Sequence, residues 1–194
     1  MVKHASDPRV QAFIFRLVKL EAGYVDNPHD KGGRTKWGIT ERVAREHGYK
    51  GKMRDLPQTI AREIYLQTYW IKPRIADISI ISPDIAWEVF EAGVNLGSGT
   101  GIKFLQRALN AFNKMGSVYE DLKVDGVCGS KTLNALQSYF EFRKEKAECV
   151  LLKALNCLQG SYYIELAEAR ETDENFVFGW IHKRISLRND DNWS

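Results

Sequence analysis

Two carboxylates near the start of the chain, Glu21 and Asp30, have the types and the settings of an acid/base pair. Glu21 follows a stretch with apolar residues at helical spacing, and Asp30 lies in a turn-rich segment nine residues later. The C-terminal end of a helix and apolar neighbours both disfavour an ionised carboxyl group, so the pKa of Glu21 is expected to be raised, as a general acid requires. Asp30, in a polar setting, is expected to stay ionised. The alternative is that Glu21 is a solvated helix-end residue and Asp30 a turn former.

The elements that must position this pair are a helix and a small lobe. Asp7 and Pro8 are favourable first residues of a helix, which an apolar face continues to Leu20. Residues 26–35 are rich in Asp, Asn, Pro and Gly, a composition typical of turns. We therefore expect a β-hairpin or an irregular lobe near residues 24–37.

The remaining chain reads as helices. Apolar spacing, caps and breakers predict helices at 41–47 after a Thr40 cap, from Pro57 to Lys72, from Ser82, at 101–113, from Ser130 through to Ala169 with a possible break at Gly160, and at 176–185. The glycines at residues 93, 97 and 99 predict a tight passage between packed helices. About eight helices with little strand make the fold class mainly α.

Composition limits the classes of function. The 194 residues, 44% of them hydrophobic, are enough for one domain, or for a large and a small lobe. A net charge of +3, spread along the chain, does not indicate a nucleic-acid partner, although it favours attraction to an anionic polymer such as a cell-wall glycan. No run of 18 apolar residues predicts membrane insertion, and the four histidines lack metal-ligand spacing, so neither metal nor cofactor is expected.

Four short motifs between residues 21 and 40 carry a family resemblance: Glu21-Ala22-Gly23-Tyr24-Val25, Asn27-Pro28, Gly32-Gly33-Arg34-Thr35 and Trp37-Gly38-Ile39-Thr40. They resemble the signature of the glycoside hydrolase family 108 N-acetylmuramidases, phage endolysins and bacterial relatives with a lysozyme-like fold. Residues 105–110 and 125–133 are similar to the core of a peptidoglycan-binding region, and Phe178-Gly179-Trp180 followed by Arg184 is similar to its end. The resemblance implies a lysozyme-like catalytic region at 1–95 and a helical peptidoglycan-binding region at 96–194, packed on it as one compact unit.

The resemblance also implies catalytic roles. The family's glutamate falls on Glu21, which would protonate the leaving oxygen of a glycosidic bond. Related phage-type lysozymes add an Asp and a Thr, which Asp30 and Thr35 match with a gap one residue shorter. Asp30 would orient or activate water held by Thr35, which implies an inverting reaction. Asp26 is a rival second carboxylate, because Asp26-Asn27-Pro28 changes the order of the family's Asn-Asp-Pro.

Four further residues are candidates for substrate binding. Tyr24 and Trp37, beside the motif, are expected to stack on sugar faces, although aromatic residues are more often part of the core. Asn95 and Gln106 have the chemistry to bind N-acetyl groups, with helix capping or surface exposure as an equal alternative.

The expected function is that of a monomeric endolysin that cleaves peptidoglycan between N-acetylmuramic acid and N-acetylglucosamine. The first residues lack the pattern of a signal peptide, so we expect synthesis in the host cytoplasm and action in the periplasm or at the cell wall, after release through a holin pore. Two alternatives remain: a lytic transglycosylase, and a wall-binding or secretion-accessory protein without turnover.

Overall fold

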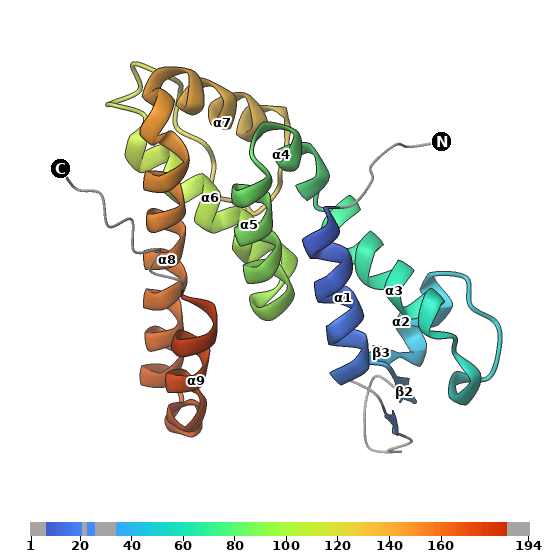
Figure 1. The fold of residues 1–194 in the computed structure, drawn as a ribbon. Helices are drawn as coiled ribbons and strands as arrows, with labels where there is room; N and C mark the ends of the chain where they lie inside the picture. Colours follow the sequence, from blue (N-terminus) through green and yellow to red (C-terminus); the bar gives the residue numbers. More distant parts are fainter. Residues whose placement is uncertain (1–6, 21–22, 26–33, 186–194) are drawn as a thin grey trace. The chain divides into compact units, whose positions relative to one another are not determined.

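The computed structural model describes residues 7–20, 23–25 and 34–185, and the chain divides into two compact units, Met1–Ala76 and Asp77–Ser194 (Figure 1). Helices make up most of the described residues, and the strands form one small sheet. The predicted mainly α class is therefore confirmed. No helix within the described ranges is long and apolar enough to cross a membrane.

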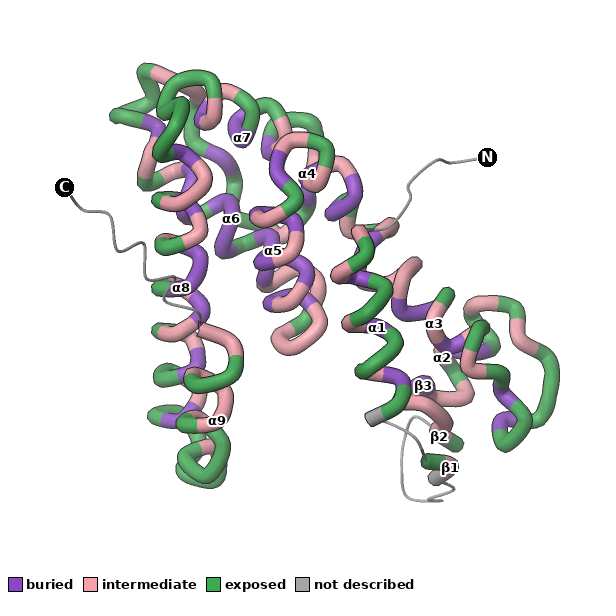
Figure 2. Tube along the Cα trace, in the orientation of Figure 1, coloured by how far each residue is buried: buried purple, intermediate pink, exposed green. Residues whose placement is uncertain are grey.

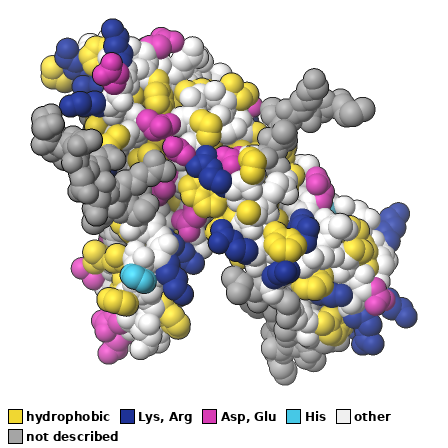
Figure 3. Space-filling view, in the orientation of Figure 1, with side chains coloured by type: hydrophobic (Ala, Val, Ile, Leu, Met, Phe, Trp, Pro, Cys, Tyr) yellow, Lys and Arg dark blue, Asp and Glu magenta, His cyan; other side chains and the backbone are white. Residues whose placement is uncertain are grey.

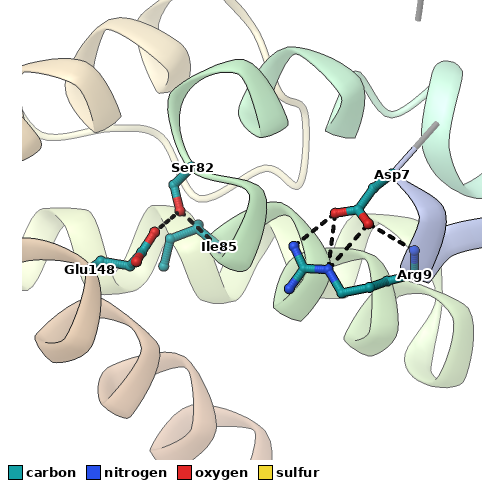
Figure 4. A network of polar contacts seen from close by, with 5 residues as sticks. All are labelled: Asp7, Arg9, Ser82, Ile85 and Glu148. Carbon is teal, nitrogen blue, oxygen red and sulfur yellow. Dashed lines mark hydrogen bonds and ion pairs between the residues drawn. The ribbon is translucent and has the colours of Figure 1, made fainter. Parts of the chain in front are cut away.

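The N-terminal unit begins with α1 (Pro8–Leu20), whose apolar side packs into the core through Val10, Ile14 and Val18. The side chain of Asp7 accepts hydrogen bonds from the backbone N–H of Arg9 at 2.8 Å and from its guanidinium group (Figure 4). The hydrogen bond from the Arg9 side chain is the main reason why the pKa of Asp7 lies below its usual range. The described part of the helix reaches Leu20, and Glu21 lies outside the described residues.

Three short antiparallel strands follow, in the order β1-β2-β3: β1 (Tyr24–Val25), β2 (Thr35–Lys36) and β3 (Ile39–Thr40). Tyr24 pairs with Lys36, and Thr35 pairs with Thr40. Trp37 and Gly38 form the two-residue turn between β2 and β3, both with positive φ (56° and 73°). Such a turn suits the twist of a hairpin, so the small lobe expected near residues 24–37 is confirmed as a sheet.

The sheet leads into the helices that complete this unit. They are α2 (Glu41–Glu46), a 3-10 turn (Met53–Asp55), α3 (Gln58–Leu66) and a π-helical turn (Gln67–Ile71). Thr40 caps α2 as predicted, since its hydroxyl accepts a hydrogen bond from the Val43 N–H at 3.4 Å. Leu56 and Trp70 are buried in the core of the unit.

The C-terminal unit is a bundle of helices. After α4 (Ile75–Ile81), at the division between the units, it contains α5 (Pro83–Leu96), α6 (Ser98–Phe112), α7 (Ser130–Arg143), a 3-10 turn (Lys144–Lys146), α8 (Ala147–Ala169), a 3-10 turn (Glu171–Asp173) and α9 (Glu174–Arg184). Figure 2 shows that the buried residues of α5, α6 and α8 follow one side of each helix. The buried Ser82 caps α5, because its hydroxyl accepts from the Ile85 N–H at 3.1 Å, and it donates to Glu148 Oε1 at 2.6 Å (Figure 4).

Glycine lets α5 and α6 approach closely. A Cβ atom on Gly101 would lie 2.3 Å from the carbonyl oxygen of Val89 and 3.1 Å from the backbone nitrogen of Gly93. No side chain fits in this space. A Cβ atom on Gly93 would likewise lie 3.4 Å from the Cα of Ser98, so the tight passage predicted from the glycines is confirmed, with Gly101 as a further member.

Two predicted helix boundaries were wrong. The long helical stretch is interrupted at Lys144–Lys146 and not at Gly160, which lies inside α8 with Ile185 packed beside it. Tertiary packing outweighs the low helix propensity of Gly160. The predicted cap at Ser130 is also corrected, since Ser130 is the first residue of α7 and Gly129 occupies the cap position. The helix at 75–81 was not predicted.

Candidate active site

The small sheet brings three of the predicted site residues together. Thr35 lies in β2, Tyr24 lies in β1 and pairs with the neighbour of Thr35, and Trp37 begins the turn that follows β2. Glu21, Asp30 and the rival Asp26 lie outside the described residues. The described part of the site is therefore one strand pair, with the end of α1 preceding it along the chain.

Trp37 is held in place by the core of the N-terminal unit. Its ring N–H donates to the carbonyl oxygen of the buried Leu56 at 2.8 Å. Its own carbonyl oxygen accepts from the Tyr65 hydroxyl at 3.2 Å. The Lys36 ammonium lies 5.3 Å from the centre of the indole ring. A half-buried aromatic ring fixed in this way can present a rigid face to a sugar.

Trp37→Phe is expected to lower the free energy of unfolding by about 1–2 kcal/mol, because the buried Leu56 carbonyl loses its partner while an aromatic ring remains. Chemical denaturation measures this loss. The matched control is Trp180→Phe, which changes a half-buried indole with ring contacts to Tyr163 and Phe176. Equal losses in both variants would contradict a specific anchoring role for the Trp37 N–H group.

Tyr24 is half-buried and belongs to a cavity of about 450 Å³. The described residues that line this cavity are Tyr24, Arg34, Glu41, Arg45, Lys50, Gly51, Lys52, Met53 and Arg54. The Arg54 guanidinium lies 5.6 Å from the centre of the Tyr24 ring. Sequence reasoning missed these basic residues, although the alternation Lys50-Gly51-Lys52-Met53-Arg54 was visible as a signal.

Asn95 and Gln106, the other predicted binding residues, belong to the C-terminal unit. The side-chain amide of Asn95 donates to Glu91 Oε1 at 2.6 Å and to the Glu91 carbonyl oxygen at 2.8 Å. Gln106 is 1% exposed; its amide nitrogen donates to Asp125 Oδ1 at 3.0 Å, and its oxygen accepts from the Gly126 N–H at 2.9 Å.

These contacts give Gln106 a structural role. The Gln106 amide nitrogen also donates to the Val127 carbonyl oxygen at 3.1 Å, so the side chain holds the loop at residues 123–129 in place. Its hydrogen bond to Asp125 is the largest of the effects that lower the pKa of that carboxyl group. The geometry does not support the predicted contact between Gln106 and substrate, and surface exposure, the alternative, is wrong because the side chain is buried. Contact of Asn95 with substrate stays a prediction.

A family match covers the sheet and its flanking helices. Residues 14–97 match the family model described as Glycosyl hydrolase 108. Over this stretch the chain is similar to that family. Residues 100–185, directly after the glycosyl hydrolase 108 region, match the model described as Predicted Peptidoglycan domain. The protein is therefore a glycoside hydrolase of the muramidase kind, and peptidoglycan is its partner.

A solved structure extends the fold comparison over nearly the whole chain. The chain is similar to the structure of Brucella abortus SagA, with 24% sequence identity over 92% of this chain and 90% of that chain, and a TM-score of 0.59. The lysozyme-like, mainly α fold is thereby confirmed. No curated protein matches the chain.

The boundary between the two matched regions differs from the boundary between the two compact units. The glycosyl hydrolase 108 region runs to residue 97 and so includes α5, whereas the structure divides between Ala76 and Asp77. The predicted division into a catalytic region at 1–95 and a peptidoglycan-binding region at 96–194 concerns function, and it stays a prediction.

A buried polar network joins α5, from the end of the glycosyl hydrolase 108 region, to α8 and α9 of the peptidoglycan domain. Glu91 accepts from Gln159 Nε2 at 3.0 Å and lies 3.4 Å from the Arg184 guanidinium. Gln159 is completely buried and also donates to the Tyr163 hydroxyl. Burial raises the pKa of the Glu91 carboxyl group, and the hydrogen bond from Gln159 and the charge of Arg184 offset part of this effect.

The raised pKa of Glu91 predicts a pH-dependent stability. Because the folded-state pKa lies above the unfolded one, the stabilisation from this group is full below the unfolded value and is lost as the pH rises through the folded value. The stability of Glu91→Gln relative to the parent is therefore expected to increase as the pH rises from about 4 to about 7, because the parent loses stability over this range. Urea titrations across this range test it, with Glu165→Gln, an exposed carboxylate on α8, as the control. If the parent instead became more stable relative to Glu91→Gln as the pH rises, burial would not be the main influence on the pKa of Glu91.

Proposed function

We propose that this glycoside hydrolase cleaves peptidoglycan at the bond between N-acetylmuramic acid and N-acetylglucosamine. The observation that carries the proposal is the glycosyl hydrolase 108 match over residues 14–97, which includes the end of α1, the sheet and every candidate catalytic residue. The adjoining peptidoglycan domain supports the same substrate, because it would keep the polymer near the catalytic region.

In the proposed mechanism Glu21 is the general acid. It protonates the glycosidic oxygen as the bond to the anomeric carbon breaks through an oxocarbenium-like transition state. Asp30 removes a proton from the attacking water, and the hydroxyl of Thr35 helps to orient that water. Attack from the face opposite the leaving group inverts the anomeric configuration. Asp26 is the alternative base.

Tyr24 and Trp37 are proposed to position the glycan. The indole of Trp37 is anchored at its N–H edge, and the ring of Tyr24 is half-buried one strand away. Aromatic rings bind sugars through their faces at a low cost in conformational entropy, because they have only two rotatable side-chain bonds. The sheet thus supplies two rigid aromatic surfaces for the glycan.

We further propose that the enzyme acts as an endolysin in the periplasm or at the cell wall, released through a holin pore. Its substrate lies outside the cytoplasmic membrane, which supports this location. Retention of the protein in the cytoplasm after co-expression with a holin would contradict it.

The deciding experiment is mass spectrometry of purified peptidoglycan digested with the parent protein. Fragments with reducing muramic acid ends are expected. Anhydromuramic ends would instead show a lytic transglycosylase, and reducing glucosamine ends would show cleavage of the other glycosidic bond. NMR of the first-formed anomer then tests inversion, because a retaining enzyme gives the opposite anomer at early times.

A further inference from the structure

The cavity beside Tyr24 has the charge of an anion-binding site. Among the described residues that line it, five are basic and one, Glu41, is acidic. The volume of about 450 Å³ lies in the range of ligand pockets. Figure 3 shows basic side chains gathered on the surface formed by the N-terminal unit.

Part of this positive charge is already used within the protein. Arg45 donates to Glu41 Oε1 at 2.7 Å and to the carbonyl oxygens of Tyr49 and Gly51 at 2.8 and 2.7 Å. It therefore braces the loop that follows α2. The Tyr49 hydroxyl donates to the Lys52 carbonyl oxygen at 3.0 Å and fixes the same loop from its other side.

The loop that Arg45 and Tyr49 brace carries two lysines whose ammonium groups are available to bind an anion. Lys50 and Lys52 flank Gly51, and both are exposed. Within the part of the chain that the structure describes, neither ammonium group has an ion-pair or hydrogen-bond partner. A rigid loop that holds two unpaired cations at the rim of a cavity is arranged to receive an anion, because little conformational entropy is lost on binding.

We propose that this cavity is a subsite for the carboxylates of the peptide stems of peptidoglycan, with Lys50 and Lys52 as the contacting cations. The inference rests on the proposed function. The cavity lies within the glycosyl hydrolase 108 region, and its lining residues Tyr24 and Arg34 flank residues 26–33, which contain Asp30. A glycan strand bound there brings its stems along, because they are attached to the muramic acid residues. Their free carboxylates are the anions that such a strand presents.

Binding to insoluble sacculi freed of teichoic acid tests the subsite without the need for turnover. The protein carries Glu21→Gln throughout, and its dissociation constant is measured by co-sedimentation. The sacculi are used in two forms, native and with their carboxyl groups coupled to methylamine by a carbodiimide, which removes the charge and keeps the stems. We expect binding to the native form to be about five- to tenfold tighter.

Lys50→Gln with Lys52→Gln is expected to remove this preference, so that both forms of sacculi bind as weakly as the amidated one. The control is Arg16→Gln with Lys72→Gln, which removes two exposed positive charges of the same unit that do not line the cavity. This control is expected to keep the preference. Melting temperatures confirm that all variants are folded.

Two results would overturn the proposal: a preference that persists without Lys50 and Lys52, or an equal loss in the control, which would indicate general electrostatic attraction. Failure of the proposed function has a different signature, namely no muramic acid ends from the parent protein on either form of sacculi.

Discussion

Glu21→Gln is expected to lower the rate at which reducing muramic acid ends are released by about 10²–10⁴-fold. The amide keeps the size and the hydrogen-bonding ability of the side chain but cannot donate a proton to the leaving oxygen. Because the loss affects the transition state, kcat is expected to fall, while binding to sacculi remains as in the parent. Chromatography of the released muropeptides measures the rate.

The matched control is Glu63→Gln, an exposed glutamate of α3 that accepts a hydrogen bond from Gln67. This variant is expected to keep the parental rate. Asp30→Asn and Asp26→Asn distinguish the two candidate bases, since substitution of the true base is expected to lower the rate nearly as much as Glu21→Gln. Thr35→Ala tests the residue proposed to orient the water. Parental turnover by Glu21→Gln would exclude Glu21 as the acid.

Gly101→Ala is expected to destabilise the C-terminal unit by about 2–3 kcal/mol. The added methyl group would lie 2.3 Å from the carbonyl oxygen of Val89, a backbone atom that cannot rotate away. To relieve the overlap, α5 and α6 must move apart, which opens the core around Val89, Phe90 and Leu105. Urea unfolding followed by circular dichroism measures the loss.

The control for this prediction is Gly179→Ala, in the middle of α9, where an added Cβ meets nothing within 4 Å. Alanine in place of glycine in an open helical position is expected to stabilise the protein by about 0.5–1 kcal/mol. The two substitutions are chemically identical and opposite in sign. A small effect at Gly101 would show that the two helices separate more easily than their packing indicates.

The parts of the fold that sequence predicted well are those fixed by neighbours along the chain. Thr40 and Ser82 mark the starts of α2 and α5 because a hydroxyl group three residues before a free N–H is sufficient to cap a helix. The apolar spacing of α1 likewise predicts a helix without information about the residues that pack against it.

Features that depend on distant residues could not be read in this way. The position of Gln106 in the sequence does not reveal that its amide binds a loop 20 residues later. The basic cavity is assembled from β1, Arg34, α2, and the loop and 3-10 turn that follow α2, so the stretch from Lys50 to Arg54 shows only part of it. Gly160 reads as a helix breaker, whereas the contact with Ile185 favours its place within α8.

The position of α5 has a consequence for how this protein can be divided or recombined. The glycosyl hydrolase 108 match includes this helix, yet Ile85, Val89 and Phe90 are buried in the unit formed with α6 and α8. A chimera joined at residue 97 would keep α5 and replace α6, and so would change only one of the two helices that pack together at Gly101. We therefore expect a peptidoglycan domain of this type to be exchangeable between proteins only together with α5, which places the workable junction near residues 76 and 77.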